Sequence, residues 1–289
     1  MRKCDYLSCD LQLERNQSSL FYHLRVHPNR QKCGDDKKVF VKKGQVINMN
    51  NHKNTKKTRT GLKDTWNAFM CKGAKYSEHD IPFCPTVLTG IPKEIITWEE
   101  AKQLHKKLVR KDRKYFYDAF ICFYMDDYKF DGVRSSIWLF PWLALRVLKH
   151  FRGIITPDFS TYQDFPYPLK LWNTFRMRSF GYWAGTQGLE VINNVRWGTS
   201  ETYHYCFDGI DKDSVVAIGT VGGSPRKVAD RKRFVDGLEE MVMKLEPHTI
   251  IVYGSADYPC FKELEKRGIR IITFKSYTAK YYEGRTKDE

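Results

Sequence analysis

Four metal-binding side chains near the amino end of the chain have a spacing that suits one zinc ion. Cys4, Cys9, His23 and His27 follow the pattern C-x4-C-x13-H-x3-H. Two thiolates and two imidazoles are a ligand set that tetrahedral structural zinc sites use. The pattern predicts a helix over residues 18–27, which places His23 and His27 one turn apart on the same face. We therefore expect a structural Zn²⁺ site, because so short a segment needs a metal ion to fold.

This segment resembles the two-Cys, two-His zinc-finger family. Such fingers have about twelve residues between the second Cys and the first His, and this chain has one more. Leu13 and Leu20 stand where a finger keeps its small apolar core. Cys33 is an alternative ligand, and a Cys-rich hairpin without metal is the competing interpretation.

Three carboxylates follow two apolar runs farther along the chain. Asp126 and Asp127 come after the run 119–125, and Asp158 follows the run 153–156. Active sites of parallel α/β folds gather at the carboxyl ends of strands, and hard cations prefer carboxylate oxygens. The three aspartates are therefore candidate catalytic residues around Mg²⁺ or Mn²⁺ for phosphodiester cleavage. The alternative is that Asp158 caps the next helix.

The charge of the chain is strongly positive and unevenly distributed. The formal net charge is +15, and residues 1–60 hold 14 Lys or Arg against 5 Asp or Glu. A basic arm of this kind is typical of proteins that bind polyanions, although a solubilising tail has the same composition. The candidate phosphate-binding residues are Arg25, Lys56, Lys57 and Arg59, together with Arg226 and Lys227 after a glycine pair at the start of a predicted helix.

Composition predicts a soluble protein with one large domain and a small appendage. The chain has 289 residues, of which 42% are hydrophobic, and no apolar run reaches the length of a membrane span. The amino end has no apolar run of the kind found in signal peptides, so we expect a cytoplasmic location and reduced thiols. The predicted parts are a zinc-finger-like module at 1–33, a basic linker at 34–62 and an α/β domain at 63–289.

The α/β domain is predicted from apolar runs that alternate with helical segments. Runs of this kind, separated by helices, are typical of a parallel sheet buried on both faces, either doubly wound or an irregular TIM-like barrel. Thr97 and Glu100 predict a capping box at the start of a helix over 97–111. The other predicted helices cover 134–150, 168–184, 200–207, 227–245 and 258–267, and the predicted strands cover 119–125, 153–156, 189–197, 214–221, 249–253 and 269–274.

Several sequence blocks of this domain resemble a known family. The blocks MDDYKFDGV, LEVINNVRW, YCFDGIDKDSVVAIGTVG and EPHTIIVYG look like the bacterial, phage and plasmid family called domain of unknown function 4417, over about residues 80–275. The resemblance implies a phage or other mobile element as the setting. It implies no reaction and transfers no catalytic residue.

The sequence is consistent with three functions and leaves open whether the chain is an enzyme. The first is a nucleic-acid-binding protein of a phage or other mobile element, with a zinc-stabilised basic amino end. The alternative is a divalent-metal-dependent nuclease or hydrolase that uses Asp126, Asp127 and Asp158. The second alternative is an adaptor that binds a phage or host protein.

Overall fold

Seven parallel strands form one sheet in which each strand pairs with its neighbours in the sequence. The computed structural model describes residues 40–42, 45–47, 64–221 and 228–285. The order in the sheet is β3-β4-β5-β6-β7-β8-β9, and every neighbouring pair is parallel. The strands are β3 (Ile95–Thr97), β4 (Tyr117–Cys122), β5 (Phe151–Ile155), β6 (Glu190–Asn194), β7 (Val215–Gly219), β8 (Thr249–Tyr253) and β9 (Arg270–Phe274).

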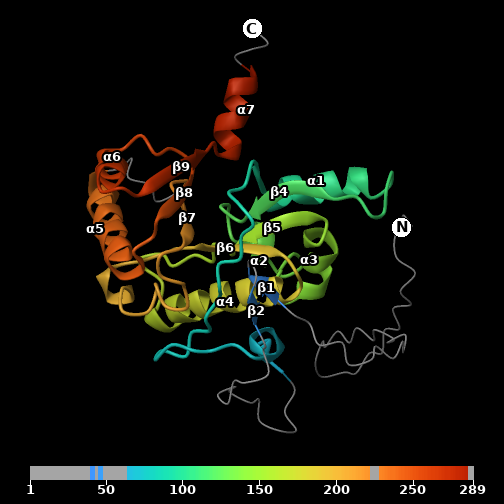
Figure 1. The fold of residues 1–289 in the computed structure, drawn as a ribbon, viewed down its shortest axis with the longest axis horizontal. Coiled ribbons are helices and arrows are strands. Elements are labelled where there is room, and N and C mark those ends of the chain that lie inside the picture. Colours follow the sequence, from blue (N-terminus) through green and yellow to red (C-terminus); the bar gives the residue numbers. More distant parts are fainter. Residues whose placement is uncertain (1–39, 43–44, 48–63, 222–227, 286–289) are drawn as a thin grey trace, which may run out of the picture. The chain divides into compact units, whose positions relative to one another are not determined.

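This strand order favours a barrel-like sheet over a doubly wound one. Right-handed crossovers between successive strands place every connecting helix on the same face of the sheet. A doubly wound sheet needs a point where the strand order reverses, and no reversal occurs among these strands. The doubly wound alternative is therefore wrong, and the sheet is an open half-barrel with β3 and β9 at its edges (Figure 1).

The connecting helices lie around the outside of this curled sheet. Helices α5 and α6 lie beside β7, β8 and β9, whereas α1, α3 and α4 lie beside the earlier strands (Figure 1). The α-helices are α1 (Trp98–Leu108), α2 (Tyr128–Asp131), α3 (Pro141–Leu148), α4 (Tyr167–Thr186), α5 (Val228–Leu245), α6 (Pro259–Lys266) and α7 (Tyr277–Arg285), and the 3₁₀ helices are η1 (Ala68–Cys71) and η2 (Ser200–Thr202).

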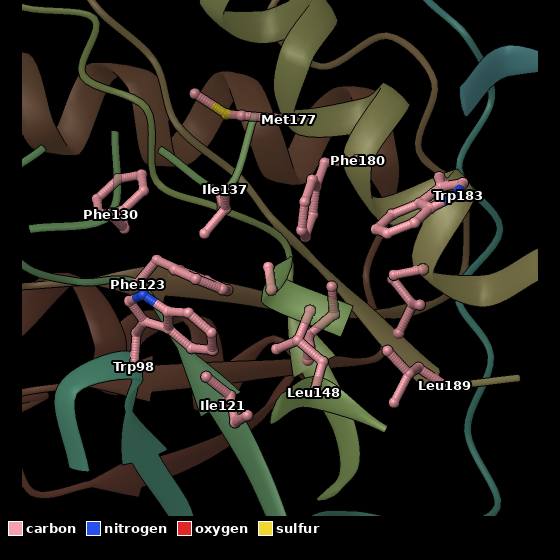
Figure 2. Close-up of a cluster of buried hydrophobic side chains, with 14 of the residues drawn as sticks. Trp98, Ile121, Phe123, Phe130, Ile137, Leu148, Met177, Phe180, Trp183 and Leu189 are labelled. Carbon is pink, nitrogen blue, oxygen red and sulfur yellow. The ribbon is translucent and has the colours of Figure 1, made fainter. Parts of the chain in front are cut away.

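Side chains alternate between the two buried faces of each strand. In β4, Ala119 and Ile121 belong to the outer core, while Phe120 and Cys122 belong to the cluster inside the half-barrel. Since both faces are buried, the strand is apolar throughout, as expected for a parallel sheet. Figure 2 shows ten labelled members of the outer core.

One aromatic side chain crosses the inside of the half-barrel. Tyr124 follows β4, yet its ring is stacked on that of Tyr253 in β8 with 5.2 Å between the ring centroids. It also packs against Gly219 of β7, where an added Cβ would lie 2.6 Å from Cδ1 of Tyr124. These contacts connect the second strand of the sheet with the fifth and sixth, so they need a curled sheet.

The structure confirms most predicted elements and corrects others. All six predicted strands are present, and both hydrogen bonds of the capping box between Thr97 and Glu100 are formed. The prediction lacked β3, α2 and α7. Of the predicted helix 200–207 only the 3₁₀ turn η2 is formed, and the helix predicted over 134–150 begins at Pro141, because proline is favoured in a first turn and breaks a helix interior.

The amino-terminal part contributes one described pair of strands, which belongs to a separate compact unit. β1 (Phe40–Lys42) pairs antiparallel with β2 (Gln45–Ile47) inside the segment predicted as a linker. The predicted zinc ligands Cys4, Cys9, His23, His27 and Cys33 lie outside the described residues, so the zinc site stays a prediction. Of the helices in the described ranges, none has the length and apolar character that a membrane span requires.

Two glycines of α4 test how tightly this helix packs on the sheet. A Cβ at Gly181 would overlap the side chain of Thr156 and lie 2.7 Å from Sγ of Cys84, whereas a Cβ at Gly185 meets only Val191, at 3.6 Å. We expect Gly181→Ala to lower the free energy of unfolding by about 1–2 kcal/mol, because overpacking outweighs the better helix propensity.

The matched control is Gly185→Ala, which we expect to raise the free energy of unfolding by about 0.5–1 kcal/mol. Urea denaturation of both variants measures the difference. Equal effects of the two substitutions would contradict the packing described for α4.

Candidate functional site

A first hydrogen-bond network joins the carboxyl ends of β4, β5 and β6. The Tyr124 hydroxyl donates to Oδ1 of Asn194 at 3.0 Å, and Nδ2 of Asn194 donates to Oδ1 of Asp158 at 2.8 Å. The other carboxylate oxygen of Asp158 lies 3.4 Å from Nη1 of Arg196. The strand order accounts for this network, since it places the ends of β4, β5 and β6 next to one another.

Burial holds the Tyr124 hydroxyl in its protonated form. The pKa of Tyr124 is raised well above its ordinary value, first because the side chain is removed from water and second because the Asp158 carboxylate is near. The hydroxyl is therefore a permanent donor at physiological pH. Its bond to Oδ1 of Asn194 leaves the amide nitrogen of Asn194 directed at Asp158.

A second network ties the loop after β5 to α4. Asp127 accepts hydrogen bonds from the backbone N–H of Ser160 at 3.1 Å and from its hydroxyl at 2.7 Å. The side chain of Asn173 donates to the Ser160 carbonyl, and Arg176 donates to Oδ1 of Asn173 at 2.6 Å. Arg176 also pairs with Asp131 at 2.6 Å. The loop that carries Asp158 is thus held at Ser160 from both the loop after β4 and α4.

The three predicted catalytic aspartates have different partners. Asp127 is occupied by Ser160, and Asp158 by Asn194 and Arg196, while the side chain of Asp126 is 67% exposed with Lys129 as its partner at 3.8 Å. Within the described ranges, no group of three or more His, Cys, Asp or Glu is arranged to hold a metal ion. The structure does not bring the three aspartates together as ligands of one ion, and their catalytic role stays a prediction.

The capping alternative for Asp158 is wrong. The next helix, α4, begins at Tyr167 and has Pro166 at its N-cap position, with no side-chain capping bond. Eight residues of loop separate Asp158 from that helix. The carboxylate instead orients Arg196 at the end of β6.

A cavity of about 590 Å³ opens beside this guanidinium group. Its walls come from the loop after β5, the ends of β6 and β7, and the first turns of α5. They are formed by residues 161–164, 195–199 and 218–219 together with Asp230, Arg233 and Phe234. The position agrees with the general location of ligand sites at the carboxyl ends of parallel strands.

Two arginines and three aromatic rings give the cavity its chemical character. Arg233 of α5 pairs with Asp230 at 2.6 Å. The ring of Trp197 lies 5.5 Å from that of Phe234, between centroids. At Gly237 of α5 a Cβ would overlap the Trp197 ring, so this glycine lets the helix approach it closely.

One polar atom in the cavity wall has no partner. Thr161 is only 3% exposed, and its hydroxyl makes no hydrogen bond within the described part of the chain. Buried hydroxyls are nearly always paired, and an unpaired one costs about 1–3 kcal/mol.

Sequence reasoning found only part of this site. It identified the strand ends around Asp158, but it gave no role to Arg196 or Trp197, although both come at the end of a predicted strand. Thr161 and Arg233 carry no local motif, because a loop and a helix bring them to the cavity. The six predicted phosphate-binding residues, Arg25, Lys56, Lys57, Arg59, Arg226 and Lys227, lie outside the described residues.

Comparison with known proteins places the chain in a family. Residues 75–275 match the family described as Domain of unknown function (DUF4417), and the chain belongs to it. It is 35% identical over 183 residues to the "Gene 1 protein" of Mycobacterium phage D29, covering 63% of each chain. It is 36% identical over 132 residues to the "Gene 1 protein" of Mycobacterium phage L5, covering 46% of this chain and 56% of that protein.

The chain therefore spans less than two thirds of the length of these relatives. The matches confirm the expected family and its association with phages. No solved structure matches the chain significantly.

The buried carboxyl of Asp127 gives a pH-dependent prediction. Burial raises the pKa of Asp127, and the hydrogen bonds from Ser160 partly offset this by lowering it. The nearby carboxylates of Asp158 and Asp131 raise the pKa further. The folded protein thus binds the proton more tightly than the unfolded chain, so ionisation of Asp127 lowers stability as the pH rises above the unfolded pKa. We expect the stability of Asp127→Asn relative to the unsubstituted protein to increase from about pH 3 to about pH 7.

Urea denaturation across this pH range measures the effect, with Asp257→Asn as the control because that carboxylate is 85% exposed. A stability difference between Asp127→Asn and the unsubstituted protein that does not change with pH would contradict the assignment.

Proposed function

We propose that this phage-associated protein binds nucleic acid at the cavity beside β6, β7 and α5. The observation that carries the proposal is the combination of two guanidinium groups with three aromatic rings in one cavity at the carboxyl edge of the sheet. Guanidinium groups bind phosphate, and aromatic rings stack on bases. The family and its phage relatives are compatible with this function but do not assign it.

Both guanidinium groups keep donors for a phosphate although each has a carboxylate neighbour. A guanidinium group has five N–H donors in a planar fork. In the part of the chain that the structure describes, Arg196 meets Asp158 through Nη1, and Arg233 meets Asp230 through Nη2. Among those residues, the other N–H groups of both side chains are left for phosphate oxygens, and the carboxylates limit the positions that each side chain adopts.

The basic amino-terminal segment is the second part of the proposal. Residues 1–60 have an excess of nine positive charges, from 14 Lys or Arg against 5 Asp or Glu. Such a segment adds sequence-independent phosphate contacts and a strong dependence on salt. In this proposal the predicted Zn²⁺ stabilises the segment, while the cavity binds one position of the nucleic-acid chain.

Fluorescence anisotropy with labelled single-stranded and double-stranded oligonucleotides tests the proposal. We expect Arg233→Ala to weaken single-strand binding by about 1–2 kcal/mol, or roughly 5- to 30-fold in Kd. The slope of log Kd against log salt concentration should fall by about one. The matched control is Arg231→Ala on the same helix, because Arg231 is exposed and does not line the cavity.

Equal affinities of the two arginine variants would show that the cavity is not the binding site. Absence of any salt-sensitive binding by the full chain would overturn the proposal itself, and the adaptor alternative would then take its place.

The same samples with Mn²⁺ or with EDTA test the nuclease alternative. Binding without cleavage is the expected result, since Asp127 and Asp158 are occupied by Ser160, Asn194 and Arg196. Cleavage that requires Mn²⁺ would instead make the chain an enzyme, and Asp158→Ala would then be the first variant to assay.

A further inference from the structure

The polar groups of the cavity suit a ligand with more functional groups than a phosphate alone. The lining contains the carboxylates of Asp164 and Asp230 as well as the guanidinium groups of Arg196 and Arg233. Carboxylates repel a bare polyanion, but they accept hydrogen bonds from the amino groups of bases and from ribose hydroxyls. A nucleotide carries both kinds of group on one molecule.

The loop after β5 adds a residue with a buried hydroxyl, Thr161, to the lining of the cavity. Thr161 lies in the loop after β5, three residues beyond Asp158, and it lines the cavity at 97% burial (3% exposed). Its hydroxyl has no partner in the described ranges. Because a hydroxyl both donates and accepts, it suits the edge of a base or a sugar hydroxyl, which have both kinds of atom.

Two aromatic side chains of the lining, Tyr162 and Trp197, are not fully buried. Tyr162 is 51% exposed, so its ring is accessible to a ligand, and Trp197 is backed by Phe234. A volume of about 590 Å³ lies within the range of pockets that enclose a single small ligand. It is too small to enclose a stacked duplex, whose bases are already covered by their neighbours.

We infer that the cavity binds one unstacked nucleotide, with its phosphate at Arg196 and Arg233, its base against Tyr162 and Trp197, and a polar edge at Thr161. This inference rests on the proposed function and specifies its ligand. The nucleotide belongs either to a single strand or to the free pool, and the chemistry of recognition is the same for both.

The test is competition in solution with the full chain. A labelled single-stranded oligonucleotide is bound, and nucleoside 5′-monophosphates, inorganic phosphate or unlabelled duplex are added as competitors. We expect the monophosphates to compete at least about tenfold better than inorganic phosphate and the single strand to bind better than the duplex.

Two variants test whether the monophosphates bind in the cavity. Tyr162→Ala removes an exposed ring, and Thr161→Val replaces the hydroxyl with a methyl group of nearly the same size. We expect each to weaken monophosphate binding by about fivefold or more, with the melting temperature measured in parallel. Phe116→Ala is the control, because Phe116 is 64% exposed and lies next to the amino end of β4, away from the cavity.

The outcomes separate this inference from the proposed function. Suppose that oligonucleotides bind and that this binding depends on Arg233. The nucleotide inference is then overturned, and the proposed function stands, if monophosphates compete no better than phosphate. The same holds if both variants bind monophosphates normally. If no oligonucleotide binds, both are overturned. Monophosphates that bind as tightly as the strand identify the free nucleotide as the ligand, and tighter binding of the strand identifies a single-strand site.

Discussion

The contact of Tyr124 with Gly219, Asn194 and Tyr253 is the constraint on which the site depends. A side chain from the end of β4 reaches β6, β7 and β8 only because the sheet curls, and the ring fits only because Gly219 has no Cβ. Burial keeps the hydroxyl protonated, so it always donates to Asn194. One residue thus connects the curvature of the sheet with the orientation of the polar groups at its carboxyl edge.

From Asn194 the same network extends through Asp158 to Arg196. Asp158 was expected from the sequence to hold a metal ion, but in this structure it accepts hydrogen bonds from an amide and faces a guanidinium group. The Asp158 carboxylate lies 3.4 Å from Nη1 of Arg196, which lines the cavity. A single guanidinium group held by a carboxylate loses little freedom when it meets a phosphate, which is how preorganisation improves affinity.

The sequence predicted the strands better than it predicted the site. Apolar runs such as 249–253 correspond to strands buried on both faces, and that pattern is visible without a structure. β3 has only three residues directly before the capping box, so the helix signal dominated there. Pairings such as Tyr124 with Asn194 depend on the curl of the sheet, and Arg233 and Thr161 reach the cavity from elements far apart in the sequence. No local spacing encodes such contacts.

The most direct test of this account is photochemical cross-linking of a single-stranded oligonucleotide to the full chain, followed by mass spectrometry of the modified peptides. The account predicts adducts on Tyr162 or Trp197, and it predicts that an excess of nucleoside monophosphate suppresses them. Adducts confined to residues 1–60, with none on the cavity residues, would show that the basic segment binds nucleic acid without the cavity and would contradict the central claim.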